Sequence, residues 1–121
     1  METEKYVSMA QNWIKAWNSR DMEEIMSHYA DDIDFQSATV IRTLQRPDGR
    51  LKGKKDLREH FTRGLANAPK LHFTLEQVFF NPGGYGMLYS RENGNRVIEC
   101  MELNEQGLVI RSRIFYAQPP V

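Results

Sequence analysis

The strongest constraint on the fold is a hairpin pattern near the C-terminal end of the chain. Two stretches, 95–103 and 108–116, alternate apolar and polar residues on either side of a turn that contains Gly107. Alternation with a period of two is typical of strands, and a short glycine-containing turn between two such stretches predicts an antiparallel hairpin. Because side chains alternate across a strand, Glu99 shares a face with apolar residues two positions away on each side. The pattern therefore places one carboxylate in the middle of an apolar face.

Two further strands precede this hairpin in the sequence. They are predicted over residues 71–76 and 85–92. The second is followed by Asn93 and Gly94, a strong signal for a tight two-residue turn. A tight turn would set Leu88 opposite Glu99, so we expect Leu88 and, two residues on, Ser90 to face the interior.

The first half of the chain predicts three amphipathic helices. They cover residues 2–18, 21–29 and 54–66, where apolar side chains recur at helical spacing. In the first of them, Trp13 and Trp17 lie one turn apart on the apolar face. Between the second and the third helix, residues 33–37 alternate as a short strand with Ser37 on its inner face. We predict an extra strand or a lid over residues 39–44.

Composition narrows the class of protein. A chain of 121 residues is predicted to form one domain, 1–121. Lysine plus arginine and aspartate plus glutamate number 16 each, and the resulting zero net charge gives no electrostatic footprint for nucleic acid or an anionic membrane. Cys100 is the only cysteine, which favours a cytoplasmic protein without an intramolecular disulfide. No apolar run approaches the length of a membrane span.

The order of the predicted elements is helix, helix, strand, helix and then four strands joined by short turns. Helices segregated from an antiparallel meander are typical of the α+β class. We expect a curved, mostly antiparallel sheet wrapped around three helices from the N-terminal half of the chain. Such a sheet leaves a gap at its open end, where small molecules commonly bind.

The ordered set of motifs resembles the nuclear transport factor 2-like superfamily, and within it the SnoaL-like group. The matching features are the segment 29–32 (Tyr-Ala-Asp-Asp) before a short strand, Gly53 before a leucine-rich helix, and the turn 105–109 (Glu-Gln-Gly-Leu-Val). The resemblance spans essentially the whole chain. It implies a cone-shaped α+β barrel with an internal pocket, usually in a dimer formed through the outer face of the sheet. Members include ketosteroid isomerase, scytalone dehydratase, polyketide cyclases and pocketed proteins with no known reaction.

The resemblance also implies roles for particular residues. Compared with ketosteroid isomerase, Glu99 matches the protonated acid of the oxyanion hole, whereas Ser37 stands in place of the general-base aspartate and Trp13 in place of the oxyanion-hole tyrosine. Two of the three roles are thus lost, which argues against steroid isomerisation by that mechanism. The His–Asp pair expected of a polyketide cyclase or a dehydratase is not evident either, because none of the three histidines, His60 among them, is predicted to face the pocket.

Three functions remain open from the sequence. The first is an isomerase, dehydratase or cyclase acting on a small, mostly apolar molecule, with Glu99 as the acid or base and Ser37 as a second catalytic candidate. Burial would raise the pKa of Glu99 for this role. The alternatives for Glu99 are an ion pair with an arginine or a position at the wet rim of the pocket. The second function is a non-catalytic binding domain for a small apolar ligand.

The third function is an interaction module that uses the outer face of the sheet. An exposed face rich in apolar residues usually has a partner, here most simply a second copy of the chain in a homodimer. The apolar residues predicted on this face are Met87, Tyr89, Ile98, Cys100 and Phe115.

The pocket itself is predicted from the inward-facing side chains, and neither a metal ion nor another cofactor is expected in it. The predicted lining residues are Trp13, Trp17, Tyr29, Phe35, Phe61, Leu65, Phe73, Leu88, Ser90, Met101, Ser112 and Tyr116.

Overall fold

The computed structural model of the chain describes residues 3–118, which form helices and one sheet. The helices are α1 (Glu4–Ser19), α2 (Met22–Met26), α3 (Ala38–Leu44) and α4 (Lys54–Asn67). The strands are β1 (Tyr29–Gln36), β2 (Arg50–Lys52), β3 (Thr74–Asn81), β4 (Gly84–Ser90), β5 (Arg96–Leu103) and β6 (Val109–Tyr116). The first and third predicted helices are confirmed, except that residue 2 of the first lies outside the described residues. The second, predicted over 21–29, ends at Met26, and Tyr29 is the first residue of β1 rather than part of the helix.

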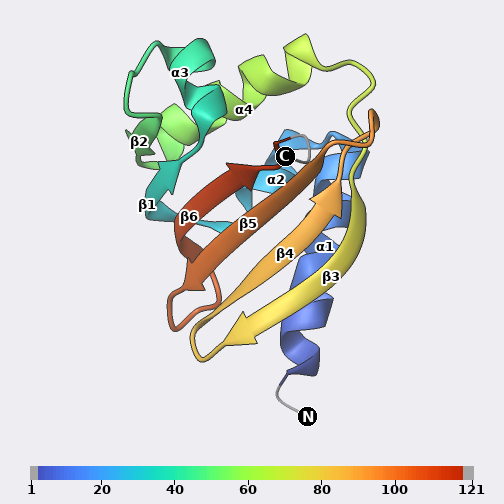
Figure 1. Cartoon of the computed structure of the whole chain (residues 1–121). Helices are drawn as coiled ribbons and strands as arrows, with labels where there is room; N and C mark the ends of the chain where they lie inside the picture. Colours follow the sequence, from blue (N-terminus) through green and yellow to red (C-terminus); the bar gives the residue numbers. More distant parts are fainter. Residues whose placement is uncertain (1–2, 119–121) are drawn as a thin grey trace.

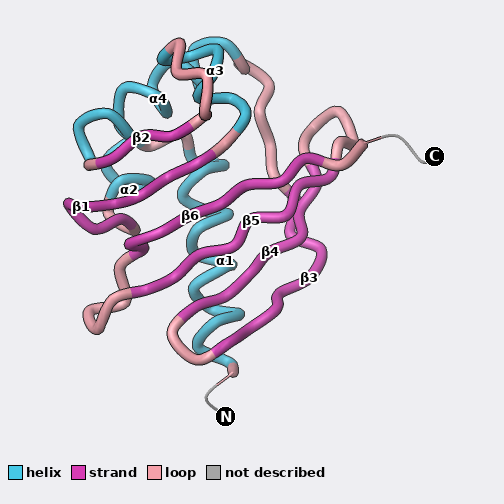
Figure 2. The backbone as a smooth tube through the Cα atoms, turned by 60° about the vertical axis from the view of Figure 1, so that its left-hand side comes forward, coloured by secondary structure: helices cyan, strands magenta, loops and turns pink. Residues whose placement is uncertain are grey.

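The sheet has the strand order β2-β1-β6-β5-β4-β3, and it curls without closing. Its neighbouring strands are antiparallel except for β1 and β6, which are parallel. Helix α1 packs against β3 and β4, whereas α4 packs against β1 and β2 (Figures 1 and 2). The α+β class and the curved, mostly antiparallel sheet are therefore confirmed, with a core enclosed between the sheet and the helices.

The strand predicted as one alternative over residues 39–44 is wrong, because this segment is the helix α3, and the other alternative, a lid, stays a prediction. The β-branched residues of α3 favour a strand by propensity, but local capping and burial outweigh that preference. The Ser37 side chain accepts a hydrogen bond from the backbone N–H of Thr39 at 3.3 Å and so caps the helix. Val40 is fully buried in the core. The helix lies above α4 at one end of the sheet (Figure 2).

The predicted register between β4 and β5 is also wrong, by one residue. Met87 rather than Leu88 lies opposite Glu99. The turn is wider than two residues, since the N–H of Arg91 donates to the carbonyl oxygen of Asn95 at 2.8 Å. A shift of one residue exchanges the two faces of a strand. Met87 and Tyr89, predicted on the outer face, are therefore buried in the interior, and Leu88 and Ser90 lie on the outer face instead.

Strand β3 begins at Thr74, later than predicted, and runs on to Asn81. The preceding segment 68–73 crosses from α4 to the sheet without regular structure, anchored where the N–H of Phe73 donates to the Asn18 side chain at 2.8 Å. Asn18 in turn donates to the Phe73 carbonyl oxygen at 2.8 Å. This pair of hydrogen bonds holds the segment against the C-terminal end of α1.

The turn between α3 and β2 depends on Gly49. Its φ angle is +67°, and a β-carbon there would lie 2.6 Å from the carbonyl oxygen of Ser37, the residue that caps α3. We expect Gly49→Ala to lower the free energy of unfolding by about 2 kcal/mol or more, through both backbone strain and this overlap. Urea denaturation measures the loss.

Gly83→Ala is the matched control, because Gly83 also has a positive φ angle, +85°, but would have no atom within 4 Å of the added carbon. Only the backbone strain, about 1 kcal/mol, should be lost there. Equal losses in the two variants would show that the close approach to Ser37 contributes nothing.

Candidate functional site

A cavity of about 400 Å³ lies between the concave face of the sheet and the helices α1, α3 and α4. Its volume suits a small organic molecule. The apolar part of its wall consists of Trp13, Trp17, Phe35, Phe61, Gly64, Ala68, Leu71, Phe73, Val97 and Ile114. The polar part consists of Thr39, Arg42, Thr43, His60, Asn67, Tyr89, Arg91, Glu99 and Tyr116.

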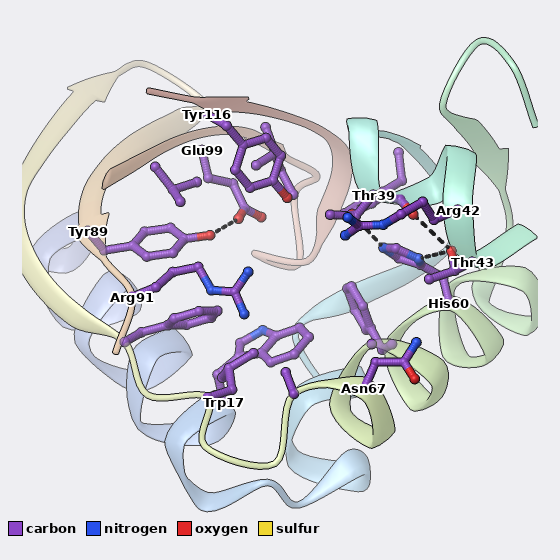
Figure 3. A pocket seen from close by; sticks show the side chains of 18 of the residues that line it. Trp17, Thr39, Arg42, Thr43, His60, Asn67, Tyr89, Arg91, Glu99 and Tyr116 are labelled. Carbon is purple, nitrogen blue, oxygen red and sulfur yellow. Dashed lines mark hydrogen bonds between the residues drawn. The ribbon is translucent and has the colours of Figure 1, made fainter. Parts of the chain in front are cut away.

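The carboxyl group of Glu99 is the most deeply buried charged or acidic group of this wall. The residue is 1% exposed and lies in the middle of β5. The Tyr89 hydroxyl donates to its Oε1 at 2.9 Å from β4, and the Ser112 hydroxyl donates to its Oε2 at 3.1 Å from β6 (Figure 3 shows the first bond). Within residues 3–118 Glu99 makes no ion pair. The carboxyl group is thus held by neutral hydroxyls, neither at a wet rim nor against an arginine.

Burial raises the pKa of Glu99 to about 7, although the hydrogen bonds from Tyr89 and Ser112 act in the opposite direction. Both the neutral and the ionised form are therefore populated near neutral pH. Burial, together with the neighbouring Glu99, raises the pKa of Tyr89 well above its ordinary value. Tyr89 consequently remains a phenol that donates to the carboxylate. A carboxyl group in this state can take up or release a proton at neutral pH.

The structure brings part of the predicted pocket together. Trp13, Trp17, Phe35, Phe61, Phe73 and Tyr116 line the cavity. Tyr29, Leu65, Met101 and Ser112 are buried in the core but are not part of the cavity wall. Leu88 and Ser90 do not line the cavity, because the register of β4 places their side chains on the outer face of the sheet. Whether the lining residues bind a ligand stays a prediction.

Ser37, the second catalytic candidate, has a structural role as the cap of α3. Its hydroxyl lies 3.0 Å from the Tyr116 hydroxyl and 2.8 Å from the Thr39 hydroxyl. Ser37 thus connects the cavity residue Tyr116 to the first turn of α3. It is buried beside the cavity rather than part of its wall, and its catalytic role stays a prediction.

The prediction that no histidine faces the pocket is wrong for His60. The residue is 5% exposed and lines the cavity from α4. Its Nδ1 lies 2.6 Å from the Thr43 hydroxyl and its Nε2 lies 3.4 Å from the Thr39 hydroxyl. Burial lowers the pKa of His60 to about 4, so the imidazole is neutral at pH 7. His60 was missed because α3, which covers it, was not predicted as a helix.

Three of the other cavity residues that the sequence did not predict, Arg42, Tyr89 and Arg91, were missed for related reasons. Arg42 lies on the unpredicted α3, and Tyr89 and Arg91 follow the β4 register that was predicted one residue out. A wider turn after β4 is the signal that could have found the latter two, since a loop of five residues, 91–95, places Tyr89 opposite Val97.

A metal site and a membrane-spanning helix are both absent from the described part of the chain. Among residues 3–118, no three His, Cys, Asp or Glu side chains are grouped so that they could hold a metal ion. Of the helices in the same range, none combines the length and the apolar character that a bilayer span requires.

The raised pKa of Glu99 predicts a pH-dependent stability. The pKa rises from an ordinary 4.5 to about 7 in the folded state, so folding binds a proton between these values. Stability from this group is fully present below pH 4.5 and is lost as the pH rises through 7. We expect the stability of the wild type relative to Glu99→Gln to fall by on the order of 3 kcal/mol across this window and to stay level above it.

Urea denaturation of both proteins at a series of pH values measures this difference. His60 is present in both, so its titration cancels. Glu102→Gln, on the exposed outer face of the same strand, is the control and should show no such slope. A difference between wild type and Glu99→Gln that does not change with pH would show that the buried carboxyl group titrates normally.

Comparison with known proteins places this arrangement in a family. The family model of the SnoaL-like domain matches residues 10–110. A SnoaL-like protein of unknown function from Burkholderia thailandensis is 26% identical and superposes with a TM-score of 0.88, over 93% of this chain and 94% of that one. A candidate isomerase of the SnoaL-like family from Agrobacterium tumefaciens is 14% identical, with a TM-score of 0.75 over 95% and 99% of the two chains, and shows the likeness of fold. No curated protein matches the chain. The match of the SnoaL-like model to most of its length shows that this chain belongs to the SnoaL-like family.

Proposed function

We propose that this protein binds a small, mostly apolar molecule in the cavity and that Glu99 exchanges a proton with the bound molecule. The observation that carries this proposal is a buried carboxyl group on the cavity wall with a pKa of about 7 and a hydroxyl donor on each oxygen. A general acid or base is most effective when its pKa lies near the working pH. The two hydroxyls also fix the direction of the carboxyl group, which favours one geometry for proton transfer.

The aromatic wall supports the apolar character of the ligand. The rings of Trp13 and Phe73 are stacked, with centroids 5.8 Å apart and planes at 6°. Trp17 packs edge-on against Phe61, with centroids 4.7 Å apart. Rings that pack on one another lose little further freedom when a ligand binds, so such a wall presents a preformed apolar surface.

Isomerisation is the reaction that best suits a cavity with a single group able to transfer a proton at neutral pH. His60 also lines the cavity, but its pKa of about 4 keeps it neutral and poor as a base at pH 7. An isomerase can remove a proton from one position of its substrate and return it to another through the same carboxylate. Dehydration and cyclisation usually need a separate acid and base. The candidate isomerase from Agrobacterium tumefaciens has the same fold, which supports this choice.

Binding without a reaction is the second candidate function. It is favoured by the neutral state of His60, because a pocket that only binds needs no second titrating group. The two candidates share the same cavity and differ only in whether Glu99 exchanges a proton with the ligand.

2-Tetralone in D₂O tests both candidates, because it is small and apolar and has exchangeable C–H groups beside its carbonyl. Quenching of the fluorescence of Trp13 and Trp17 measures binding, and NMR measures deuterium uptake. We expect saturable binding to wild type and to Glu99→Gln, with exchange slowed by about a hundredfold or more in the variant. The wild-type rate should rise with pH through about 7, as Glu99 ionises.

Saturable binding with equal, buffer-like exchange in both proteins would favour the binding-only function. Absence of saturable binding to the wild type would count against the use of this cavity for apolar carbonyl compounds.

We further propose that the outer face of the sheet pairs with a second copy of the chain. Ile98 and Phe115 lie opposite each other there, 43% and 58% exposed, on the same face of the sheet as the exposed Cys100. Arg111 and Glu102 flank them with opposite charges, 3.4 Å apart. A face with an apolar centre and both charges at its edge can be self-complementary, as a two-fold interface requires.

Multi-angle light scattering at tens of micromolar, an order-of-magnitude choice for a stable interface, tests this pairing. We expect a dimer for the wild type and a monomer for Ile98→Lys, because a lysine would be buried without a partner at the interface. Val7→Lys, a change at an exposed position of α1, is the control and should stay dimeric. A monomeric wild type would contradict the proposal.

A further inference from the structure

Two arginine side chains reach into the cavity from different elements. Arg42 extends from α3, and Arg91 extends from the residue that follows β4. Figure 3 shows their guanidinium groups directed into the cavity from opposite sides. Neither was placed there by the sequence pattern, so the cavity is more cationic than its apolar wall suggests.

The charge of Arg42 has no partner within residues 3–118, where it makes neither a hydrogen bond nor an ion pair. Most other arginines of the chain do have such partners. Carboxylates lie within 3.4 Å of Arg46, Arg58, Arg63, Arg96, Arg111 and Arg113. Arg42 differs from these six arginines, and because the residue is exposed its charge is met by water rather than by a carboxylate of the protein.

Arg91 is only weakly compensated. Its Nε lies 3.7 Å from the Glu92 carboxylate, too far for a hydrogen bond, and this buried nitrogen has no hydrogen-bond partner in the described chain. The Glu92 oxygen already accepts a hydrogen bond from the backbone N–H of His72 at 3.2 Å. The Arg91 side chain is 25% exposed, so it is partly withdrawn from the water that would otherwise solvate its charge.

The indole donors of the two tryptophans do not add to this deficit. The Nε1 of Trp13 donates to the Tyr29 hydroxyl at 3.0 Å. The buried Nε1 of Trp17 meets no full hydrogen-bond geometry among the described residues, but the Trp17 side chain also acts on the Tyr29 hydroxyl and partly offsets the rise in the pKa of that group. The buried donor on the cavity wall that is left without an acceptor is therefore Arg91 Nε.

The cavity wall therefore carries more positive than negative charge. Glu99 is the acidic group of its wall, and its oxygens already accept bonds from Tyr89 and Ser112. His60 is neutral and adds no charge. What the wall lacks is an acceptor with negative charge for the two guanidinium groups.

We propose that the ligand of this cavity is a small apolar molecule with one carboxylate, which Arg42 and Arg91 bind. A guanidinium group matches a planar carboxylate with two parallel hydrogen bonds, and such charge-assisted bonds are stronger than those between neutral groups. The inference rests on the proposed function, because it names the substrate class for the same cavity. It gives the ligand two ends, a carboxylate at the arginines and a reactive or inert apolar part that faces Glu99 and the aromatic wall.

The test compares 4-phenylbutanoic acid with 4-phenylbutanamide, which have nearly the same shape but differ in charge. Binding is measured by calorimetry at about pH 6, where the probe acid is ionised and Glu99 is mostly neutral, so that repulsion between the two is small. We expect the wild type to bind the acid about tenfold more tightly than the amide, or better. Added salt should weaken the preference.

The variants Arg42→Gln and Arg91→Gln should each lose most of this preference while still binding the amide. Arg91→Lys should keep part of it, because the charge remains although the paired hydrogen bonds do not. Arg50→Gln is the matched control, since Arg50 is exposed on β2, outside the cavity, and its loss changes the net charge equally. Thermal unfolding shows whether each variant is folded.

The outcomes separate the two proposals. Equal binding of acid and amide by the wild type would overturn the carboxylate inference and leave the apolar pocket in place. If Arg50→Gln removes the preference for the acid as strongly as Arg42→Gln does, the preference comes from the overall charge of the protein. This result too would overturn the inference. Failure of both compounds to bind would count against the proposed function and the inference together.

Discussion

One carboxyl group, that of Glu99, is buried on the concave face of the sheet, and the arrangement of the neighbouring strands depends on it. Removing a carboxylate from water is costly unless hydrogen bonds replace the lost solvent. Here, the hydroxyls of Tyr89 and Ser112 supply those bonds from the two strands that flank β5. Their positions require β4, β5 and β6 to hold one register, so the chemistry of Glu99 and the pairing of the sheet depend on each other.

A chain of side-chain contacts connects this sheet to the helices α3 and α4. From Tyr116 on β6 the contacts pass to Ser37, then to Thr39 and on to the imidazole of His60, over distances between 2.8 and 3.4 Å. Thr43 completes it at 2.6 Å from the other ring nitrogen. These bonds hold α3 against α4 and satisfy the polar atoms of Thr39, Thr43 and His60 on the cavity wall. They explain how a buried, neutral histidine is tolerated beside an apolar pocket.

The charged groups of the cavity wall thus differ in how far the protein satisfies them. Hydroxyl groups of the chain donate to both oxygens of Glu99, whereas the buried Nε of Arg91 has no hydrogen-bond partner among the described residues. The match to the SnoaL-like family explains the curved sheet and the helices that cover it. Any function of the cavity depends on the side chains that line it rather than on the fold alone.

The sequence by itself determined the elements with strong periodicity and the fold class that follows from their order. The apolar stripes of α1 and α4 and the alternation in β5 and β6 are local signals, so periodicity alone assigns Trp13, Trp17 and Glu99 to the interior. Only the tertiary structure decided α3, the β4 register and the place of His60. In α3 a serine cap and the burial of Val40 outweighed β propensity, and in β4 a loop of five residues replaced a turn of two. Such choices depend on contacts between segments distant in the chain, and a shift of one residue in a strand exchanges its faces, which is why Tyr89 and Arg91 could not be placed by pattern alone.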